Sequence, residues 1–171
     1  MLRRTERLLL RPFTLEDYPH YAACYADAEL SRFIGGPLTA GHAWRRLAAE
    51  LGHWALRGYG YWALEDRETG AFVGSAGLWN PEGWPELEVG YWLMPEAHGR
   101  GLASEAAAEA RRHAYEELGA TTLVSYVDPE NVASARVAER LGATREGSVA
   151  LPDCGAHDVW RHPSPAELGG A

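Results

Sequence analysis

The chain has 171 residues, 46% of them hydrophobic and 23% charged, which is the composition of one globular domain with enough apolar side chains for a core. It contains no run of the roughly 20 apolar residues that a membrane-spanning helix needs. The charged start, Met1 to Arg7, also lacks the apolar segment of a signal peptide. We therefore expect a cytoplasmic protein without a membrane partner.

All 16 basic residues are arginine, against 24 acidic residues, so the formal net charge is −8. Because phosphate contacts dominate nucleic-acid affinity, this balance argues against a DNA or RNA partner. The absence of lysine excludes a lysine nucleophile or a Schiff base. The two cysteines and seven histidines show no metal-ligand spacing, so we expect no metal.

Hydrophobic periodicity and turn residues predict the elements of the first third of the chain. A strand at 8–10 ends near Pro12, and a helix at 14–27 opens with a polar cap and acidic residues. A second helix is expected at 40–57. Its apolar residues at helical spacing are Trp44, Leu47, Leu51, Trp54 and Ala55.

The rest of the chain alternates between strand and helix patterns. Aromatic and β-branched runs at 61–64, 71–74 and 87–93 are separated by turn formers, and their short spacing favours antiparallel neighbours. An alanine-rich helix follows at 101–119. The apolar face of this helix comprises Leu102, Ala106, Ala110, Ala114 and Leu118. The remaining elements are a strand, a short helix and two strands, at 121–127, 131–141, 144–151 and 157–162.

These patterns predict a mixed α/β (α+β) fold in a single domain over residues 1–162. We expect a mostly antiparallel central sheet of about seven strands, with about four helices on its faces. Residues 163–171 are expected to form a flexible tail.

The segment from Glu88 to Ala106 carries the most chemical information. A strand runs through a glycine-bearing loop directly into a helix, where the first backbone amides have no partner within the helix and the helix dipole is positive. Gly99 and Gly101 allow a ligand to approach the backbone, and Arg100 adds a positive charge. The segment therefore predicts a site for a phosphate or a pyrophosphate.

Three ligands compete for such a loop. A Walker A loop needs a lysine, which this chain lacks. A dinucleotide-binding G-x-G-x-x-G is matched only at Gly99 and Gly101, because Ser104 stands at the third glycine, and several strands precede the motif. The third ligand is coenzyme A.

The run from Gly90 to Ala106 resembles the pyrophosphate loop of the GNAT acetyltransferase superfamily, and its nearest match is the RimJ/RimL-like branch, which acetylates protein N-termini or small amines. The superfamily pattern Q/R-x-x-G-x-G/A falls on residues 98–103, with His98 in place of the usual Gln or Arg. The block N-V-A-S-A-R-V-A-E-R-L-G at 131–142 is similar to a helix of that branch. The H-D-V-W run at 157–160 and the opening at 5–12 also fit.

This resemblance implies a GNAT-like fold, in which two neighbouring central strands splay apart and acetyl-CoA, as co-substrate, lies in the cleft between them. It implies that the backbone of one strand binds the pantetheine, that the loop amides bind the pyrophosphate, and that an asparagine stands near the cofactor. The cofactor-binding residues so implied are Tyr91, Trp92, Leu93, His98, Gly99, Arg100, Gly101, Leu102, Ala103, Ser104 and Asn131. Asn131 is also a natural helix N-cap.

Acetyl transfer to an amine requires removal of a proton from the amine and stabilisation of the leaving thiolate. Many GNAT enzymes use a tyrosine seven residues after the helix asparagine for the second task, but Ala138 stands there. The resemblance to the RimJ/RimL-like branch implies Ser134 instead. Ser134 in the first turn of a helix can also have no catalytic role.

Two carboxylates are candidates for the base, and the choice between them stays open. Glu88 lies on the strand that leads into the loop, where alternation places Glu86, Glu88 and Trp92 on one face. Asp153 stands where the RimL-type pattern carries a carboxylate. Either residue can equally be a surface acid or the partner of an arginine.

The acceptor is expected to be a small-molecule or peptide amine, and a homodimer is left open. Some of the aromatic residues near the cleft should form acceptor-site walls: Tyr59, Tyr61, Trp62, Trp79 and Trp84. Glu82 and Glu86 would make the rim negative. The alternative to an enzyme is a GNAT-fold module that binds coenzyme A without turnover.

Overall fold

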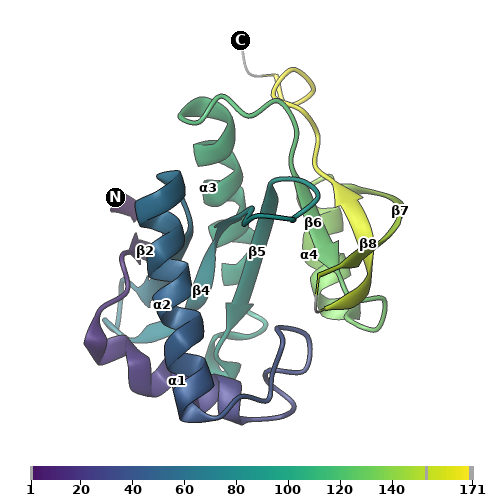
Figure 1. Ribbon diagram of the computed structural model, residues 1–171. Helices are drawn as coiled ribbons and strands as arrows, with labels where there is room; N and C mark the ends of the chain where they lie inside the picture. Colours follow the sequence, from purple (N-terminus) through teal and green to yellow (C-terminus); the bar gives the residue numbers. More distant parts are fainter. Residues whose placement is uncertain (1, 153, 170–171) are drawn as a thin grey trace.

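The computed structural model describes residues 2–152 and 154–169, whose strands form one mixed sheet (Figure 1). Eight strands occur in this part of the chain, in the spatial order β1-β2-β3-β4-β5-β6-β8-β7. All neighbours pair antiparallel except β5 and β6, which run parallel. The strands are β1 Arg3–Arg4, β2 Leu8–Arg11, β3 Tyr61–Asp66, β4 Phe72–Trp79, β5 Glu88–Leu93, β6 Val124–Val127, β7 Thr144–Leu151 and β8 Gly155–Arg161.

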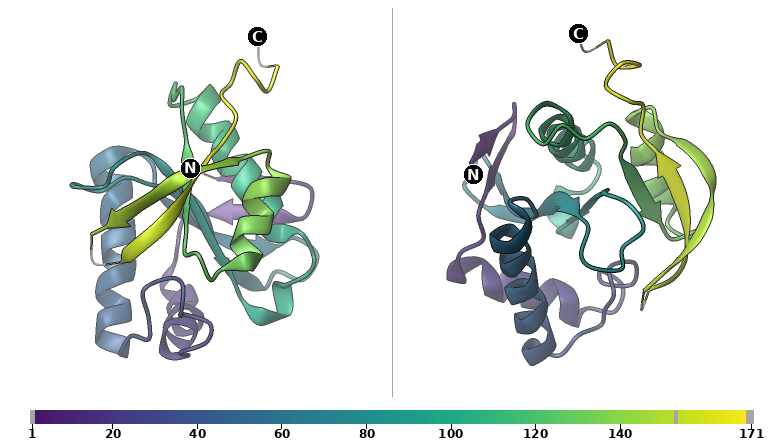
Figure 2. Two further views of the ribbon diagram at one scale, coloured as in Figure 1. Left: turned by 90° about the vertical axis from the view of Figure 1, so that its right-hand side faces the viewer. Right: turned by 45° about the horizontal axis from the view of Figure 1, so that its top comes forward.

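Helices cover both faces of this sheet, with α1 and α2 on one face and α3 and α4 on the other (Figure 2). Short 3-10 helices, η1 and η2, precede α1 and α3. The bounds are η1 Leu15–Asp17, α1 Tyr18–Ala26, α2 Ala40–Arg57, η2 Pro95–Ala97, α3 Leu102–Glu116 and α4 Val132–Arg140. No helix in the described part of the chain is both long and apolar enough to cross a membrane.

The predicted mixed, mostly antiparallel fold with four α-helices is confirmed, but the sheet has eight strands instead of about seven. The additional strand, β1, consists of two arginines, so hydrophobic alternation gives no sign of it. Its position is fixed by tertiary contacts. The Arg3 guanidinium is buried and donates to Glu109 at 3.1 Å and to Glu117 at 2.6 Å.

Helix α3 buries the face that its alanines predict. Leu102, Ala106, Ala110 and Ala114 are all 0% exposed and pack against β4 and β5. Leu118 was predicted for the same face, but it lies beyond the end of α3 and is 38% exposed. Small side chains here allow the helix to pack closely against the sheet.

Only part of the apolar set named for helix α2 is buried: Leu47 is 5% exposed and Trp54 packs against the core. Trp44 is 50% exposed and Leu51 is 42% exposed. Polar groups take the inward positions: the Tyr21 hydroxyl donates to Glu50 at 2.7 Å. The buried residues of this helix are Ala43, Leu47, Glu50 and His53.

The parallel strands β5 and β6 are joined only where they begin. Glu88 pairs with Val124, and the Val124 amide donates to Leu87 O at 3.1 Å. No later register pair between these strands occurs in the described residues. The Ser125 hydroxyl instead donates to Val89 O at 2.8 Å. The strands then diverge toward their carboxyl ends (Figure 1).

The segment after β8 contacts α3 through the Tyr115 hydroxyl, which donates to Pro163 O at 3.0 Å. Farther along, the Ser164 amide donates to the Glu167 carboxylate at 2.7 Å. The expected flexibility of residues 163–171 in solution stays a prediction.

Candidate active site

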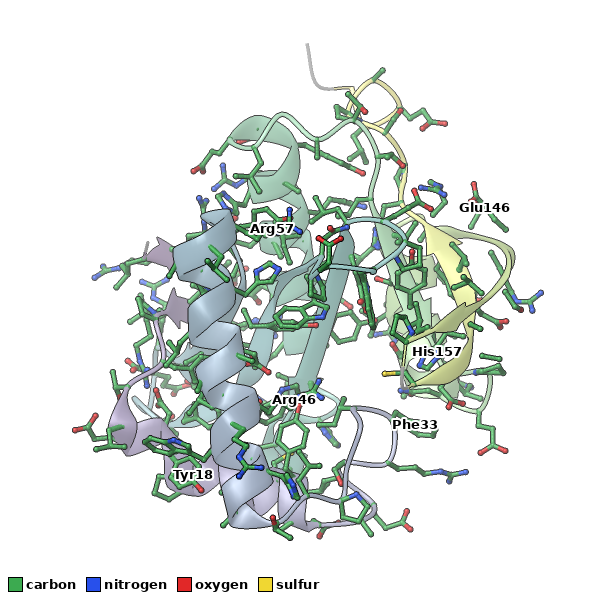
Figure 3. All side chains as sticks on the ribbon, viewed as in Figure 1. Tyr18, Phe33, Arg46, Arg57, Glu146 and His157 are labelled. Carbon is green, nitrogen blue, oxygen red and sulfur yellow. The ribbon has the colours of Figure 1, made fainter. Side chains whose placement is uncertain are left out.

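A cleft of about 580 Å³ opens where β5 and β6 diverge. Besides these two strands, its walls include α2, the loop 32–35 between α1 and α2, the segment 79–84 at the end of β4, the start of α4, and part of the hairpin that joins β7 to β8. Figure 3 shows Arg46 on α2, Phe33 on the loop and His157 on β8, three residues that line the cleft. The volume is typical of a site for a small molecule.

Strand β5 presents different chemistry to the two faces of the sheet, because successive side chains point to opposite sides. Glu88 and Trp92 face α1 and α2, and the Trp92 ring lies 5.7 Å from that of Tyr21 in α1. Val89 and Tyr91 face the opposite side and pack with the core residues of α3. The cleft is therefore reached by side chains from both faces of one strand.

Glu88 is one of two buried carboxyls that line this cleft, with Glu50, and is only 9% exposed. The indole of Trp84 donates to Glu88 Oε2 at 2.9 Å. Burial raises the pKa of Glu88 to about 7, while hydrogen bonds from Trp84 and from the Tyr126 backbone act in the opposite direction. A carboxyl with such a pKa is suited to exchange protons near neutral pH.

The Tyr61 hydroxyl lies beside Glu88 because residue 90 has no side chain. A Cβ at Gly90 would overlap Tyr61 Oη, and it would lie 3.5 Å from Glu88 Oε1. Gly90 is thus required for the packing of this wall.

Ser134 and Tyr91 meet on the other side of β5. The Tyr91 hydroxyl lies 3.0 Å from Ser134 Oγ and 3.1 Å from Ser134 O. Asn131 is the N-cap of α4, and its Oδ1 accepts from the Ser134 amide at 3.1 Å. This contact and the bond to Tyr91 fix Ser134 at the edge of the cleft.

The glycine loop after β5 has the backbone form of an anion site. Gly99 and Gly101 have φ values of +73° and +78°, which favour glycine. No described atom lies within 4 Å of a Cβ placed at Gly99, so that side of the loop is open. Gly101 is the N-cap of α3, and Leu102, Ala103 and Ser104 follow as its first three residues. Their amides have no partner within the helix.

The polar side chains of this loop differ in whether they have hydrogen-bond partners within the protein. The Arg100 guanidinium donates to Asp66 at 2.7 Å, so its charge is shared with that carboxylate. The His98 ring lies 3.0 Å from Leu93 O. Ser104 Oγ is buried and has no hydrogen-bond partner among the described residues. A buried hydroxyl without a partner at a helix N-terminus is the group that a bound phosphate oxygen would satisfy.

The sequence and fold comparisons agree with this geometry. The family model for the Acetyltransferase (GNAT) domain matches residues 7–144. The chain belongs to the GNAT acetyltransferase family.

Solved and curated relatives of this GNAT domain extend the likeness to most of the chain. An acetyltransferase from Agrobacterium tumefaciens str. C58 is 37% identical with a TM-score of 0.88, covering 96% of this chain and 95% of that one. The uncharacterized N-acetyltransferase YoaA of Bacillus subtilis (strain 168) is 28% identical over 84% of this chain and 82% of its own length. The uncharacterized protein YkkB of the same organism is 34% identical, over 57% of this chain and 61% of its own length.

The GNAT domain brings five of the predicted site residues together in the cleft, and the roles of all predicted site residues stay predictions. Glu88, Tyr91, Trp92, Asn131 and Ser134 all line the cleft. The loop 98–104 follows the diverging end of β5. Asp153, the second candidate base, lies outside the described residues. Within the described ranges, no cluster of His, Cys, Asp or Glu is arranged to hold a metal ion.

The predicted acceptor walls are only partly in place. Tyr61, Trp79 and Trp84 line the cleft. Trp62 is 0% exposed in the core. Tyr59 packs against that core and the His53 ring, 5.1 Å away.

Glu86 does not contribute a free negative charge to the rim of the cleft. Arg161 donates to both of its carboxylate oxygens, at 2.6 and 2.9 Å, and this pairing lowers the pKa of Glu86. Alternation from the sequence placed Glu86 beside Glu88. The residue instead precedes β5, where the regular alternation does not apply.

Among the polar side chains of the cleft that sequence reasoning missed are Arg46, Glu50 and the hydroxyl of Tyr91. Arg46 and Glu50 are four residues apart on α2, a spacing that places them on one face. Their polar pattern could have indicated a face directed at a site. The Tyr91–Ser134 contact joins residues 43 positions apart, and no local pattern predicts it.

Replacing Glu88 with Gln should reduce the pH dependence of stability. The pKa of Glu88 rises from 4.5 to about 7 on folding, so ionisation of the buried group costs stability as pH increases across that window. A shift of this size corresponds to at most about 3 kcal/mol. The melting temperature of Glu88→Gln should therefore fall less between pH 5 and pH 8 than that of the wild type.

Glu86→Gln is the matched control. The pKa of Glu86 is lowered, so its ion pair is fully formed throughout pH 5–8, and its loss should leave the pH slope unchanged. Part of the slope should persist in Glu88→Gln, because burial also raises the pKa of Glu50 to about 7. An identical slope in Glu88→Gln and wild type would contradict the assignment of a buried, protonated Glu88.

Proposed function

We propose that the protein is an N-acetyltransferase that moves an acetyl group from acetyl-CoA directly to a primary amine. The observation that carries this proposal is the pair of groups that reach the cleft from opposite sides of β5. Glu88 lies on one side, and the Tyr91–Ser134 hydroxyl pair lies on the other. Amine deprotonation and thiolate departure need two such groups.

The chain offers complementary groups for acetyl-CoA. The open loop at Gly99, the first amides of α3 and the unpartnered Ser104 hydroxyl suit a pyrophosphate. On the β6 side of the stretch 91–93, the backbone groups of Tyr91 and Leu93 have no strand partner among the described residues, and they suit the amides of a pantetheine. The Trp92 backbone faces β4. When bound there, acetyl-CoA supplies the activated acetyl thioester.

Glu88 serves as the base in this proposal. A protonated amine cannot attack the thioester, and a buried carboxylate with a pKa of about 7 can accept its proton. The indole of Trp84 keeps the carboxyl oriented toward the cleft. Asp153 stays the second candidate.

Ser134 serves as the hydrogen-bond donor to the leaving sulfur. A serine hydroxyl has one proton, and Ser134 can direct it to the sulfur when Tyr91 donates to Ser134 Oγ. Tyr91 is then a positioning residue, because its hydroxyl contacts Ser134. The assignment to the RimJ/RimL-like branch, with a small amine or a protein N-terminus as acceptor, is supported by the block at 131–142.

The proposed function is tested by measuring free thiol released from acetyl-CoA in the presence of a panel of primary amines. We expect amine-dependent release that Glu88→Gln lowers at least tenfold and Asp153→Asn leaves in place. Binding of acetyl-CoA without thiol release for any amine would favour a non-catalytic module that holds coenzyme A. A loss confined to Asp153→Asn would transfer the role of base to that residue.

Gly101→Asp should abolish stabilisation by acetyl-CoA, because it places a carboxylate at the N-terminus of α3. A ligand at about 100 times its Kd adds about 2.7 kcal/mol, which raises the melting temperature by several degrees. Gly101→Asn is the matched control, since both side chains tolerate a φ of +78° and only Asp is charged. NAD and ATP should give little stabilisation. Equal shifts for the two variants would contradict the pyrophosphate site.

Ser134→Ala and Tyr91→Phe should each lower kcat by about one to three orders of magnitude, with little change in KM for acetyl-CoA, since they remove an interaction made mainly in the transition state. If Tyr91 acts through Ser134, the double variant should lose no more than the worse single variant. Tyr18→Phe, which removes a hydroxyl bond outside the cleft, is the control. Additive losses in the double variant would show that Tyr91 acts independently.

A further inference from the structure

Arg46 places a positive charge on the α2 side of the cleft. Its guanidinium lies over the Tyr25 ring, 5.1 Å from the centroid, which holds the charge in place. It also lies along the loop wall at Gly35, where a Cβ would stand 3.1 Å from Arg46 Nη1. Arg46 and Glu88 both line the cleft.

This guanidinium has no close hydrogen-bonded carboxylate among the described residues. Its nearest acidic partner is Glu50, with 3.7 Å between Arg46 Nε and Glu50 Oε1. That oxygen already accepts the Tyr21 hydroxyl at 2.7 Å. By contrast, Arg11 donates to Asp17 through two nitrogens, at 2.7 and 2.8 Å. The bidentate donor set of Arg46 is therefore available to a ligand.

The other charged groups of the cleft are largely engaged. The second arginine of the lining, Arg32, pairs with Glu130. Asp128 accepts the Glu130 amide at 2.8 Å. Glu82 is fully exposed at the rim, 3.9 Å from Arg57. Arg46 is the cleft cation with the least compensation in the described part of the chain.

We propose that the acceptor is an amine that also carries a carboxylate, with Arg46 binding the carboxylate and Glu88 receiving the proton of the amine. This inference rests on the proposed acetyl transfer and names its substrate class. Free amino acids and the carboxylate of a short peptide share this chemistry. The aromatic walls formed by Tyr61, Trp79 and Trp84 favour an apolar side chain beside the two charged groups.

A carboxylate fits this site better than a phosphate. One guanidinium forms two parallel hydrogen bonds with one carboxylate and balances its single charge. A doubly charged phosphate would leave excess negative charge beside Glu50 and Glu88. The positive charge of Arg46 would repel the second ammonium group of a diamine, so a diamine is the informative competitor.

The test compares L-leucine, L-methionine and L-phenylalanine with their carboxamides, which keep the amine and lose the charge. Calorimetry in the presence of coenzyme A measures binding, and thiol release from acetyl-CoA measures turnover. We expect each amino acid to bind at least tenfold more tightly than its carboxamide. Arg46→Gln should reduce this ratio to nearly one, and Arg46→Lys should restore part of it.

Arg45→Gln is the matched control, because it makes the same change at the neighbouring position of α2, outside the cleft lining, and should keep the wild-type ratio.

Leucyl-glycine and its amide report whether a more distant carboxylate is accepted. Carboxamides or putrescine that bind as tightly as the amino acids would overturn the proposal, as would an unchanged ratio in Arg46→Gln. Because calorimetry does not need turnover, these results separate a failed acceptor assignment from a failed acetyl transfer.

Discussion

The site depends on a single parallel backbone pair between β5 and β6. Glu88 and Val124 join the strands at one end, and the Ser125 hydroxyl then takes Val89 O, which a parallel neighbour would otherwise bind. Continuous pairing would fill the space between these strands and satisfy their backbone groups. Divergence leaves a cleft with unpaired backbone along one side of β5, and it brings the loop at Gly99 to the same end.

The cleft also explains the burial of ionisable groups that would otherwise be unfavourable. A buried carboxyl is tolerated when it is protonated or hydrogen-bonded, and Glu88 and Glu50 both have a pKa raised to about 7 by burial. Each accepts a hydrogen bond from a neutral side chain, Trp84 for Glu88 and Tyr21 for Glu50. Their cost to stability is consistent with a site whose chemistry needs groups that titrate near neutral pH.

How far the sequence predicts the structure varies between elements. The spaced alanines of helix α3 predict its buried face, because such small side chains allow close packing against a sheet. The sequence pattern indicates a strand only at 71–74, but strand β4 extends to Trp79. The pattern misses this extension because Gly77 and its small neighbours have weak strand propensity. For helix α2 the apolar spacing predicts the burial of Leu47 but not that of Glu50, and Trp44 and Leu51 are exposed.

The sequence by itself determined the strand, glycine loop and helix junction around Gly101, and the Asn131 cap that presents Ser134. These features rest on positive φ angles, unpaired first-turn amides and short-range capping, all of which are local. Only the tertiary structure decided the pKa of Glu88, the contact of Tyr91 with Ser134 and the exposure of Arg46 to the cleft. Each of these depends on burial or on partners from distant elements, and local sequence patterns do not encode such distances.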